Sequence, residues 1–120
     1  MRTPAKAAGT VPAMEWRDLE RATAMIANLL ASLQLPAGAR VAVQTEKAMS
    51  NIAMLLDEAG SSLADIVKVT VYLTDIRYRE TVYRIMGRWL KGVYPVSTGL
   101  VVEALARPEW LVEIDATAVL

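Results

Sequence analysis

The stretch from residue 66 to residue 74, IVKVTVYLT, constrains the fold more than any other part of the chain. Apolar and polar side chains alternate along it, and the apolar set is Val67, Val69, Val71 and Leu73. Successive side chains of a strand point to opposite faces of a sheet, so this alternation predicts a strand with one covered and one open face. The chain must therefore build a sheet and cover one side of it.

Two stretches with helical periodicity flank this strand. Residues 46–59 repeat apolar side chains at three- and four-residue spacing and end at Gly60, which is suited to a C-terminal cap. Residues 76–91 show the same spacing, follow Asp75 as a capping residue and end at Gly92. The sequence therefore predicts two amphipathic helices, each with one apolar face.

Two further strands are predicted in the last quarter of the chain, at 98–105 and 110–120, joined by residues 106–109. Strands interleaved with helices in this order favour an α+β sandwich, in which helices cover one face of the sheet. The other face is expected to carry Val101, Leu105, Leu111 and Val119. A single small chain has no second layer for that face, so copies of the chain are expected to cover it.

The first third of the chain has a different character. Residues 1–13 contain proline and glycine without periodicity and are interpreted as a flexible arm. Residues 14–34 follow a helical pattern that Pro36 and Gly38 are expected to stop. The β-branched run at 39–44 is suited to a short buried strand.

Composition removes several classes of function. The chain has 120 residues, enough for one domain, and its 13 basic residues equal its 13 acidic ones, so a nucleic-acid or membrane partner is not expected. It has no cysteine and no histidine, which excludes thiolate and imidazole chemistry and the common zinc sites, and neither a metal nor a cofactor is expected. Without a signal peptide or a long apolar run, the protein is expected to be cytoplasmic.

Residues 44–120 resemble the Rid (YjgF-like) family of small trimeric imine/enamine deaminases. The matching parts are the block NIAMLLDEAGSSLADIVKVTVYLTD, the proline that opens a late strand, Pro95, and the closing signature VEIDA at 112–116. The resemblance implies a chorismate-mutase-like Rid fold with a single domain over 14–120, in which 14–47 is an atypical N-terminal segment. It also implies a homotrimer and a small-molecule substrate bound between subunits.

The resemblance also implies site residues, and two of them depart from the family pattern. The arginine that holds the substrate carboxylate corresponds to Ser97, and an asparagine of the preceding helix corresponds to Tyr83. A serine hydroxyl offers one neutral hydrogen bond in place of a bidentate charged clamp. Glu113 matches the residue that activates water and is the candidate catalytic residue.

Each candidate also has a structural interpretation. Glu113 alternates with Asp115 and could belong to a solvated strand face, and Tyr83 could anchor its helix on the sheet. Three further substrate-binding candidates are residues that could hold an oxyanion at a strand opening or replace the missing clamp, namely Thr98, Gly99 and Arg107. Ordinary strand initiation and a solvated turn are the alternatives for these three residues.

Residues 14–47 show a second resemblance, to the early segment of malonyl-CoA ligase-type adenylate-forming enzymes, through a helix that leads into PAGARVAV. A Rid protein would begin instead with two or three strands and a pocket-lining tyrosine. The sequence therefore suggests a junction of two gene pieces near residues 44–47. Three hypotheses remain open: a deaminase, a non-catalytic trimeric binding module, or a fusion product without selected activity.

Overall fold

The structure is a computed structural model that describes Arg21 and residues 35–120. The arm predicted at 1–13 and the helix predicted at 14–34, Arg21 excepted, lie outside the described residues. No helix within the described part of the chain has both the length and the apolar character needed to cross a membrane.

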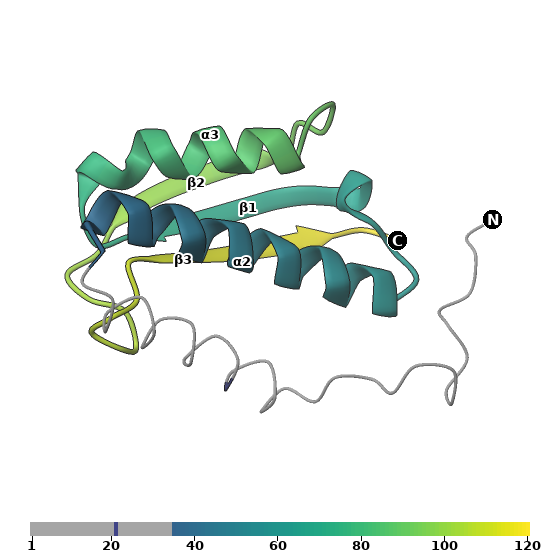
Figure 1. The fold of residues 1–120 in the computed structure, drawn as a ribbon. Helices are drawn as coiled ribbons and strands as arrows, with labels where there is room; N and C mark the ends of the chain where they lie inside the picture. The colour runs from purple at the N-terminus through teal and green to yellow at the C-terminus, as the bar shows by residue number, and fades with distance from the viewer. Residues whose placement is uncertain (1–20, 22–34) are drawn as a thin grey trace.

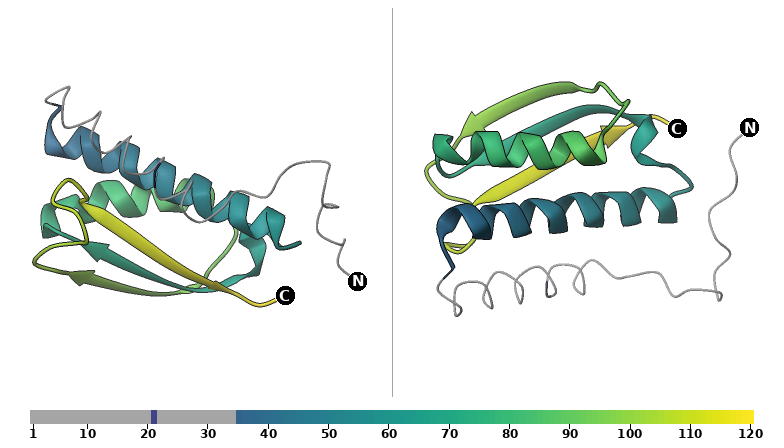
Figure 2. Two further views of the ribbon diagram at one scale, coloured as in Figure 1. Left: turned by 90° about the horizontal axis from the view of Figure 1, so that it is seen from below. Right: turned by 45° about the horizontal axis from the view of Figure 1, so that its top comes forward.

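A three-stranded sheet and two long helices make up the described part of the chain (Figure 1). In chain order the elements are α2 (Ala37–Glu58), η1 (Leu63–Asp65), β1 (Ile66–Leu73), η2 (Ile76–Tyr78), α3 (Arg79–Trp89), β2 (Val96–Val101) and β3 (Val112–Ala118). The sheet order is β2-β1-β3, with β1 parallel to β2 and antiparallel to β3. Both helices lie on the same face of the sheet (Figure 2), so the predicted one-sided α+β architecture is confirmed.

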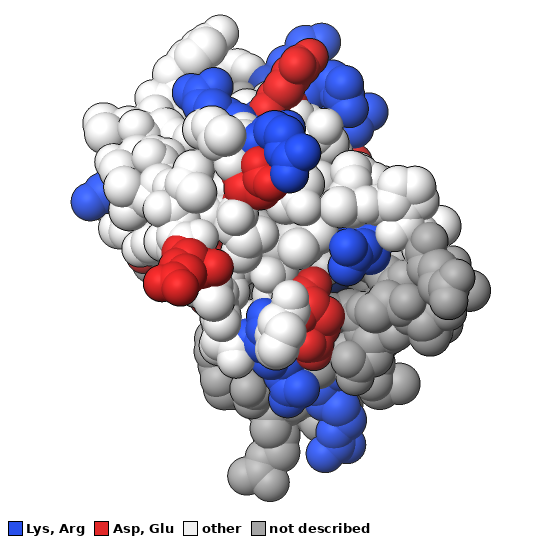
Figure 3. Space-filling view, turned by 90° about the vertical axis from the view of Figure 1, so that its left-hand side faces the viewer, with Lys and Arg blue, Asp and Glu red and all other residues white. Residues whose placement is uncertain are grey.

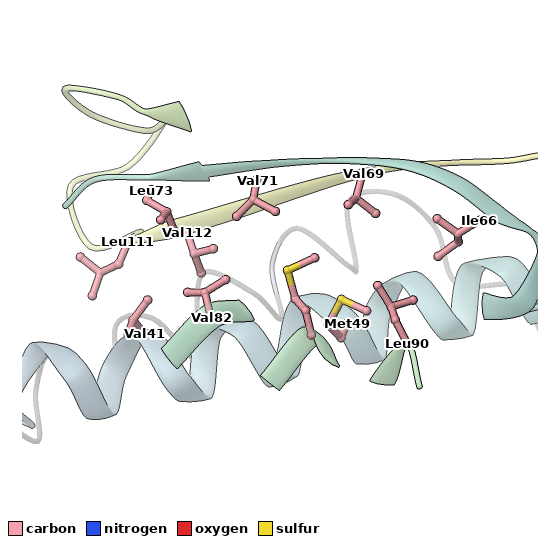
Figure 4. Close-up of a cluster of buried hydrophobic side chains, with 11 residues drawn as sticks. Val41, Met49, Ile66, Val69, Val71, Leu73, Val82, Leu90, Leu111 and Val112 are labelled. Carbon is pink, nitrogen blue, oxygen red and sulfur yellow. The ribbon is translucent and has the colours of Figure 1, made fainter. Parts of the chain in front are cut away.

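The core lies between the helices and the sheet. Figure 4 shows Val41 and Met49 of α2, with Val82 of α3 and Leu90 just after its end, below the apolar residues of β1. Val71, at the centre of β1, has no exposed surface. The alternation along residues 66–74 therefore does what the sequence predicts, and directs one row of side chains into a single core.

Val67 is an exception to that alternation. It was expected with the buried set, but its side chain is 46% exposed, whereas Ile66 is buried. The pairing register between β1 and β3 shifts between Ile66 and Lys68, which places two successive residues, Val67 and Lys68, on the exposed side. Such an irregularity inserts one residue into the pleat, and the sequence alternation does not reveal it.

The strand predicted at 39–44 is wrong, because these residues form the first turns of α2. Pro36 and Gly38 were expected to stop the helix predicted at 14–34, which lies outside the described residues. Pro36 is the residue before the first turn, where its missing N–H costs no helical hydrogen bond. Val41 and Met49 are two turns apart and both reach the core, so packing of a helical stripe overrides the β-propensity of the run.

Gly60 ends α2 as predicted. Its φ of 75° is a left-handed conformation that glycine adopts without strain. Its N–H donates to the Asp57 carbonyl at 3.0 Å, and the Ser61 N–H donates to the Leu56 carbonyl at 2.8 Å. These two bonds satisfy carbonyl groups that the helix end would otherwise leave unpaired.

The last two strands are shorter than predicted, and two side-chain assignments change. Leu111 was expected on the open face but is only 8% exposed and belongs to the core. It precedes β3, and its N–H donates to Gln44 Oε1 of α2 at 2.8 Å. Val101 pairs with Leu73, so it points to the helix side at the edge of the sheet.

Asp75 is the predicted capping residue, and its contacts lead to a prediction about how the stability of the fold depends on pH. Its carboxylate accepts a hydrogen bond from the Arg77 backbone N–H at 2.8 Å. It also accepts hydrogen bonds from the Arg77 guanidinium, the shortest of which is 2.6 Å. The guanidinium hydrogen bonds, and then the backbone one, lower the pKa of Asp75 to about 2. A carboxylate whose pKa is depressed on folding stabilises the fold above its unfolded pKa of about 3.9 and loses that effect as the pH falls toward 2.

Urea unfolding of the wild type and of Asp75→Asn should therefore show a stability difference at pH 5 that shrinks steadily between pH 4 and pH 2. A difference that stays constant over this range would mean that the Asp75 charge does not contribute to stability.

Candidate functional site

The pairing register separates the predicted site residues onto the two faces of the sheet. Ser97 and Gly99 of β2 lie opposite Val69 and Val71, so they share the face that the helices cover. Thr98 lies opposite Thr70, on the open face. Glu113 lies opposite Tyr72 and is also on the open face. One chain therefore does not bring Glu113 and Ser97 together.

Tyr83 connects the first group of candidates. Its hydroxyl is 3.4 Å from Ser97 Oγ, and a Cβ atom placed on Gly99 would come within 2.6 Å of it. The Arg79 guanidinium lies 4.5 Å from the centre of the Tyr83 ring. The two positions that depart from the Rid pattern, 83 and 97, are thus neighbours, and the Tyr83 phenol fills the space above Gly99.

A groove of about 480 Å³ opens beside this group, between α3 and the start of β2. One wall is the helix face at three- and four-residue spacing, Tyr83, Met86, Gly87 and Leu90. The remaining lining residues come from the floor, the connecting loop and the edge strand, namely Val69, Lys91, Gly92, Val93, Tyr94, Pro95 and Ser97. The volume is within the range of about 300–1,000 Å³ that is typical of small-molecule sites.

The sequence predicted Tyr83 and Ser97 but missed the rest of the groove. Met86 and Lys91 were not among the candidate residues. The spacing of residues 83, 86, 87 and 90 was the signal that could have marked one continuous helix face. That spacing alone could not show that β2 returns beside this face.

Glu113 is exposed on the open face, two residues before Asp115 on the same side of β3. Among the described residues no cation or hydrogen-bond donor engages its carboxylate. In a single chain it therefore lies on a solvated strand face, as the structural interpretation expected. On the same face, but across β1 from Glu113, two apolar side chains of β2 are also uncovered, Val96 at 68% and Leu100 at 46% exposure.

Arg107 lies outside the groove. Its guanidinium Nη1 is 3.8 Å from Glu109 Oε1, and its charge lies 5.8 Å from the Trp110 ring. Both partners come from the same loop, so this arginine has a local structural role. Its assignment to a substrate stays a prediction.

Charges of both signs are intermixed on the end of the molecule at which α3 begins (Figure 3). Neither colour forms a broad continuous patch on this face. Within Arg21 and residues 35–120, no three acidic side chains come together in a group that could hold a metal ion. The notable features of the described chain are therefore the groove on one side of the sheet and the partner-free Glu113 on the other.

Comparison with known proteins decides the family. A family model described as endoribonuclease L-PSP matches residues 8–120. The chain belongs to the Rid family, which is also known by the names YjgF and L-PSP. A crystal structure of a YjgF/YER057c/UK114 member from Mycobacterium tuberculosis has a TM-score of 0.65 and 36% identity, over 67% of this chain and 68% of that one. The predicted Rid fold is thereby confirmed.

Curated Rid relatives match at similar identity. A RutC family protein of Pyrococcus abyssi is 35% identical over 75 residues, which cover 62% of this chain and 58% of the relative. The human protein named 2-iminobutanoate/2-iminopropanoate deaminase is 33% identical over 79 residues, which cover 66% of this chain and 57% of the relative. The chain thus spans less than two thirds of the length of these relatives.

The Rid family match includes residues 14–47, the segment for which a ligase-type origin was predicted. Membership of the Rid family therefore does not stop at residue 44. The ligase origin of the early segment stays a prediction.

Proposed function

We propose that this Rid protein hydrolyses reactive imines or enamines to carbonyl compounds and ammonia. The observation that carries the proposal is Glu113, whose carboxylate no described residue binds and which the family resemblance places in the closing strand at the position of the water-activating residue. The names of the human and bovine relatives, 2-iminobutanoate/2-iminopropanoate deaminase, support the reaction class.

The reaction needs one water molecule and no change of oxidation state. Glu113 takes a proton from water while the water oxygen attacks the carbon of the protonated imine, which gives a carbinolamine. Glu113 passes this proton to the nitrogen, the carbon–nitrogen bond breaks while the carbinolamine hydroxyl loses its own proton to solvent, and ammonia leaves the new carbonyl compound. The Ser97 hydroxyl, with the backbone at Gly99, holds the polar end of the substrate, whereas Thr98 points to the open face and its role stays a prediction. General-base assistance of this kind contributes roughly 10²–10⁴-fold to a rate.

We further propose that the site forms between copies of the chain, in a homotrimer. Glu113 and the groove lie on opposite faces of one sheet, so the carboxylate of one copy must act on a substrate held by another. The open face supports such an assembly, because Val96 and Leu100 expose apolar surface there and the described chain supplies no layer above them. Assembly would also bring Glu113 out of bulk solvent.

A non-catalytic binding module is the second candidate. It is favoured by the contact between Tyr83 and Ser97, which places two neutral hydroxyls where the family has an arginine and an asparagine. A fusion product without selected activity is the third. We do not propose RNA cleavage, despite the family description, since 13 basic and 13 acidic residues give no net positive charge to attract a phosphate backbone.

The test is ammonia release from freshly generated 2-aminoacrylate, followed with and without the purified full chain. We expect a rate well above spontaneous hydrolysis and proportional to protein concentration. A rate equal to the spontaneous background, with 2-aminoacrylate and with larger imino acids alike, would overturn the proposed function.

A further inference from the structure

The groove beside α3 has a mainly apolar lining. Its floor and helical wall present Val69, Met86 and Leu90, and Val93 with Pro95 closes the end formed by the loop. The hydroxyl groups of Tyr83 and Ser97 add two polar groups to the lining, next to each other. A ligand that fills this space must bring an apolar body and a limited number of polar atoms.

Gly87 gives independent support for a ligand in the groove. It lies within α3, where glycine costs helix stability relative to alanine. Close packing does not require it, because a Cβ atom placed there would have nothing within 4 Å, and the residue is exposed. Because Gly87 has no side chain, the helical wall of the groove is open at this position.

Lys91 gives the groove its charge. Among the described residues that line the groove it is the one charged side chain, and it follows α3 directly. No ion pair with a carboxylate is formed by Lys91 within the part of the chain that the structure describes. Its ammonium group is therefore available to an anion, and its four-carbon chain can reach along the groove.

We propose that this groove binds carboxylates with a branched aliphatic or aromatic body, and that Lys91 holds the carboxylate in place of the arginine that Ser97 replaces. The inference rests on the proposed function and deepens it: the substrates are imines of large apolar amino acids. The apolar body lies against Met86 and Leu90, the open wall at Gly87 admits it, and the Ser97 hydroxyl donates a hydrogen bond to the carboxylate.

Binding of stable product analogues tests this directly. Calorimetry with the full chain should show that 4-methyl-2-oxopentanoate binds at least tenfold more tightly than pyruvate, because the additional carbon atoms are removed from water. The amide of the same acid, which has no charge, should bind about tenfold more weakly than the acid. Equal affinity for the large and the small acid would overturn the inference.

Two groove variants separate binding from folding. Gly87→Leu replaces a poor helix former by a good one and projects its side chain back over the groove, toward Tyr83. We expect its Tm to rise by about 3–5 °C while binding of 4-methyl-2-oxopentanoate is lost. Gly87→Ala should raise Tm similarly and keep binding, so a loss of binding in both variants or in neither would contradict the groove assignment.

The charge assignment has its own controls. Lys91→Gln should weaken binding of 4-methyl-2-oxopentanoate about tenfold and leave binding of its amide unchanged. Arg84→Gln removes an exposed charge from the same helix outside the groove and should change neither. If Arg79→Gln, which removes the cation stacked on Tyr83, weakens binding and Lys91→Gln does not, Lys91 is the wrong residue.

Failure of the inference and failure of the proposed function give different results. Tight, Lys91-dependent binding without ammonia release would support the groove and overturn the deaminase. Ammonia release from 2-aminoacrylate without selective binding of large acids would support the deaminase and overturn the groove assignment.

Discussion

The Glu113→Gln variant is expected to lose imine hydrolysis by roughly 10²–10⁴-fold, the full contribution of a general base. Glutamine has nearly the same shape but cannot accept a proton from water. The side chain is exposed, and no partner engages it among the described residues, so the change should leave the free energy of unfolding within about 0.5 kcal/mol of the wild type. The measurement is kcat/KM for ammonia release, with urea unfolding of the same samples.

Glu103→Gln is the matched control. It makes the same chemical change at another exposed glutamate, in the loop between β2 and β3, and should keep wild-type activity. Retention of activity by Glu113→Gln would remove the carboxylate from the mechanism. Equal losses in both variants would point to a general effect of charge rather than to a base.

Val71→Asp is expected to abolish folding. Val71 has no exposed surface and lies at the centre of β1, between α2, α3 and the two edge strands. A carboxylate there would lose its hydration without gaining a partner, at a cost of several kcal/mol, which is comparable with the whole stability of about 5–15 kcal/mol of a small domain. Circular dichroism should show loss of helix and strand signal at 25 °C.

Val67→Asp is the control for that prediction, since it makes the same substitution in the same strand at a position that is 46% exposed. It should remain folded. If Val71→Asp kept a cooperative thermal transition near that of the wild type, the assignment of the β1 faces would be wrong.

Sequence signals that act on their own stretch of backbone predicted the local structure correctly. The alternation of β1 from Val69 to Leu73, the glycine at 60 and the aspartate at 75 act through their own backbone, and all three do what was expected. The run at 39–44 failed because a short β-branched segment fits a strand and a buried helix turn equally well. Only the core contact of Val41 in α2 decides between them.

The candidate site could be predicted only in part, for a related reason. Family resemblance pointed to Ser97, Tyr83 and Glu113, but the face that each side chain occupies depends on the register of β1 with its neighbours. That register sends Ser97 to the helix side and Glu113 to the open side. The groove depends further on the return of β2 beside α3, which places Lys91 and Ser97 in one lining.

The central claim is that each site combines the groove of one copy with Glu113 of another copy. Subunit complementation tests this claim most directly. Glu113→Gln keeps an intact groove, and Gly87→Leu keeps an intact carboxylate, so each variant alone should be nearly inactive. If each site takes its groove from one copy and its carboxylate from the next, an equal mixture that is unfolded and refolded together should recover about a quarter of the wild-type activity. A mixture no more active than the two separate variants, although light scattering shows that the copies assemble, would contradict a site shared between copies.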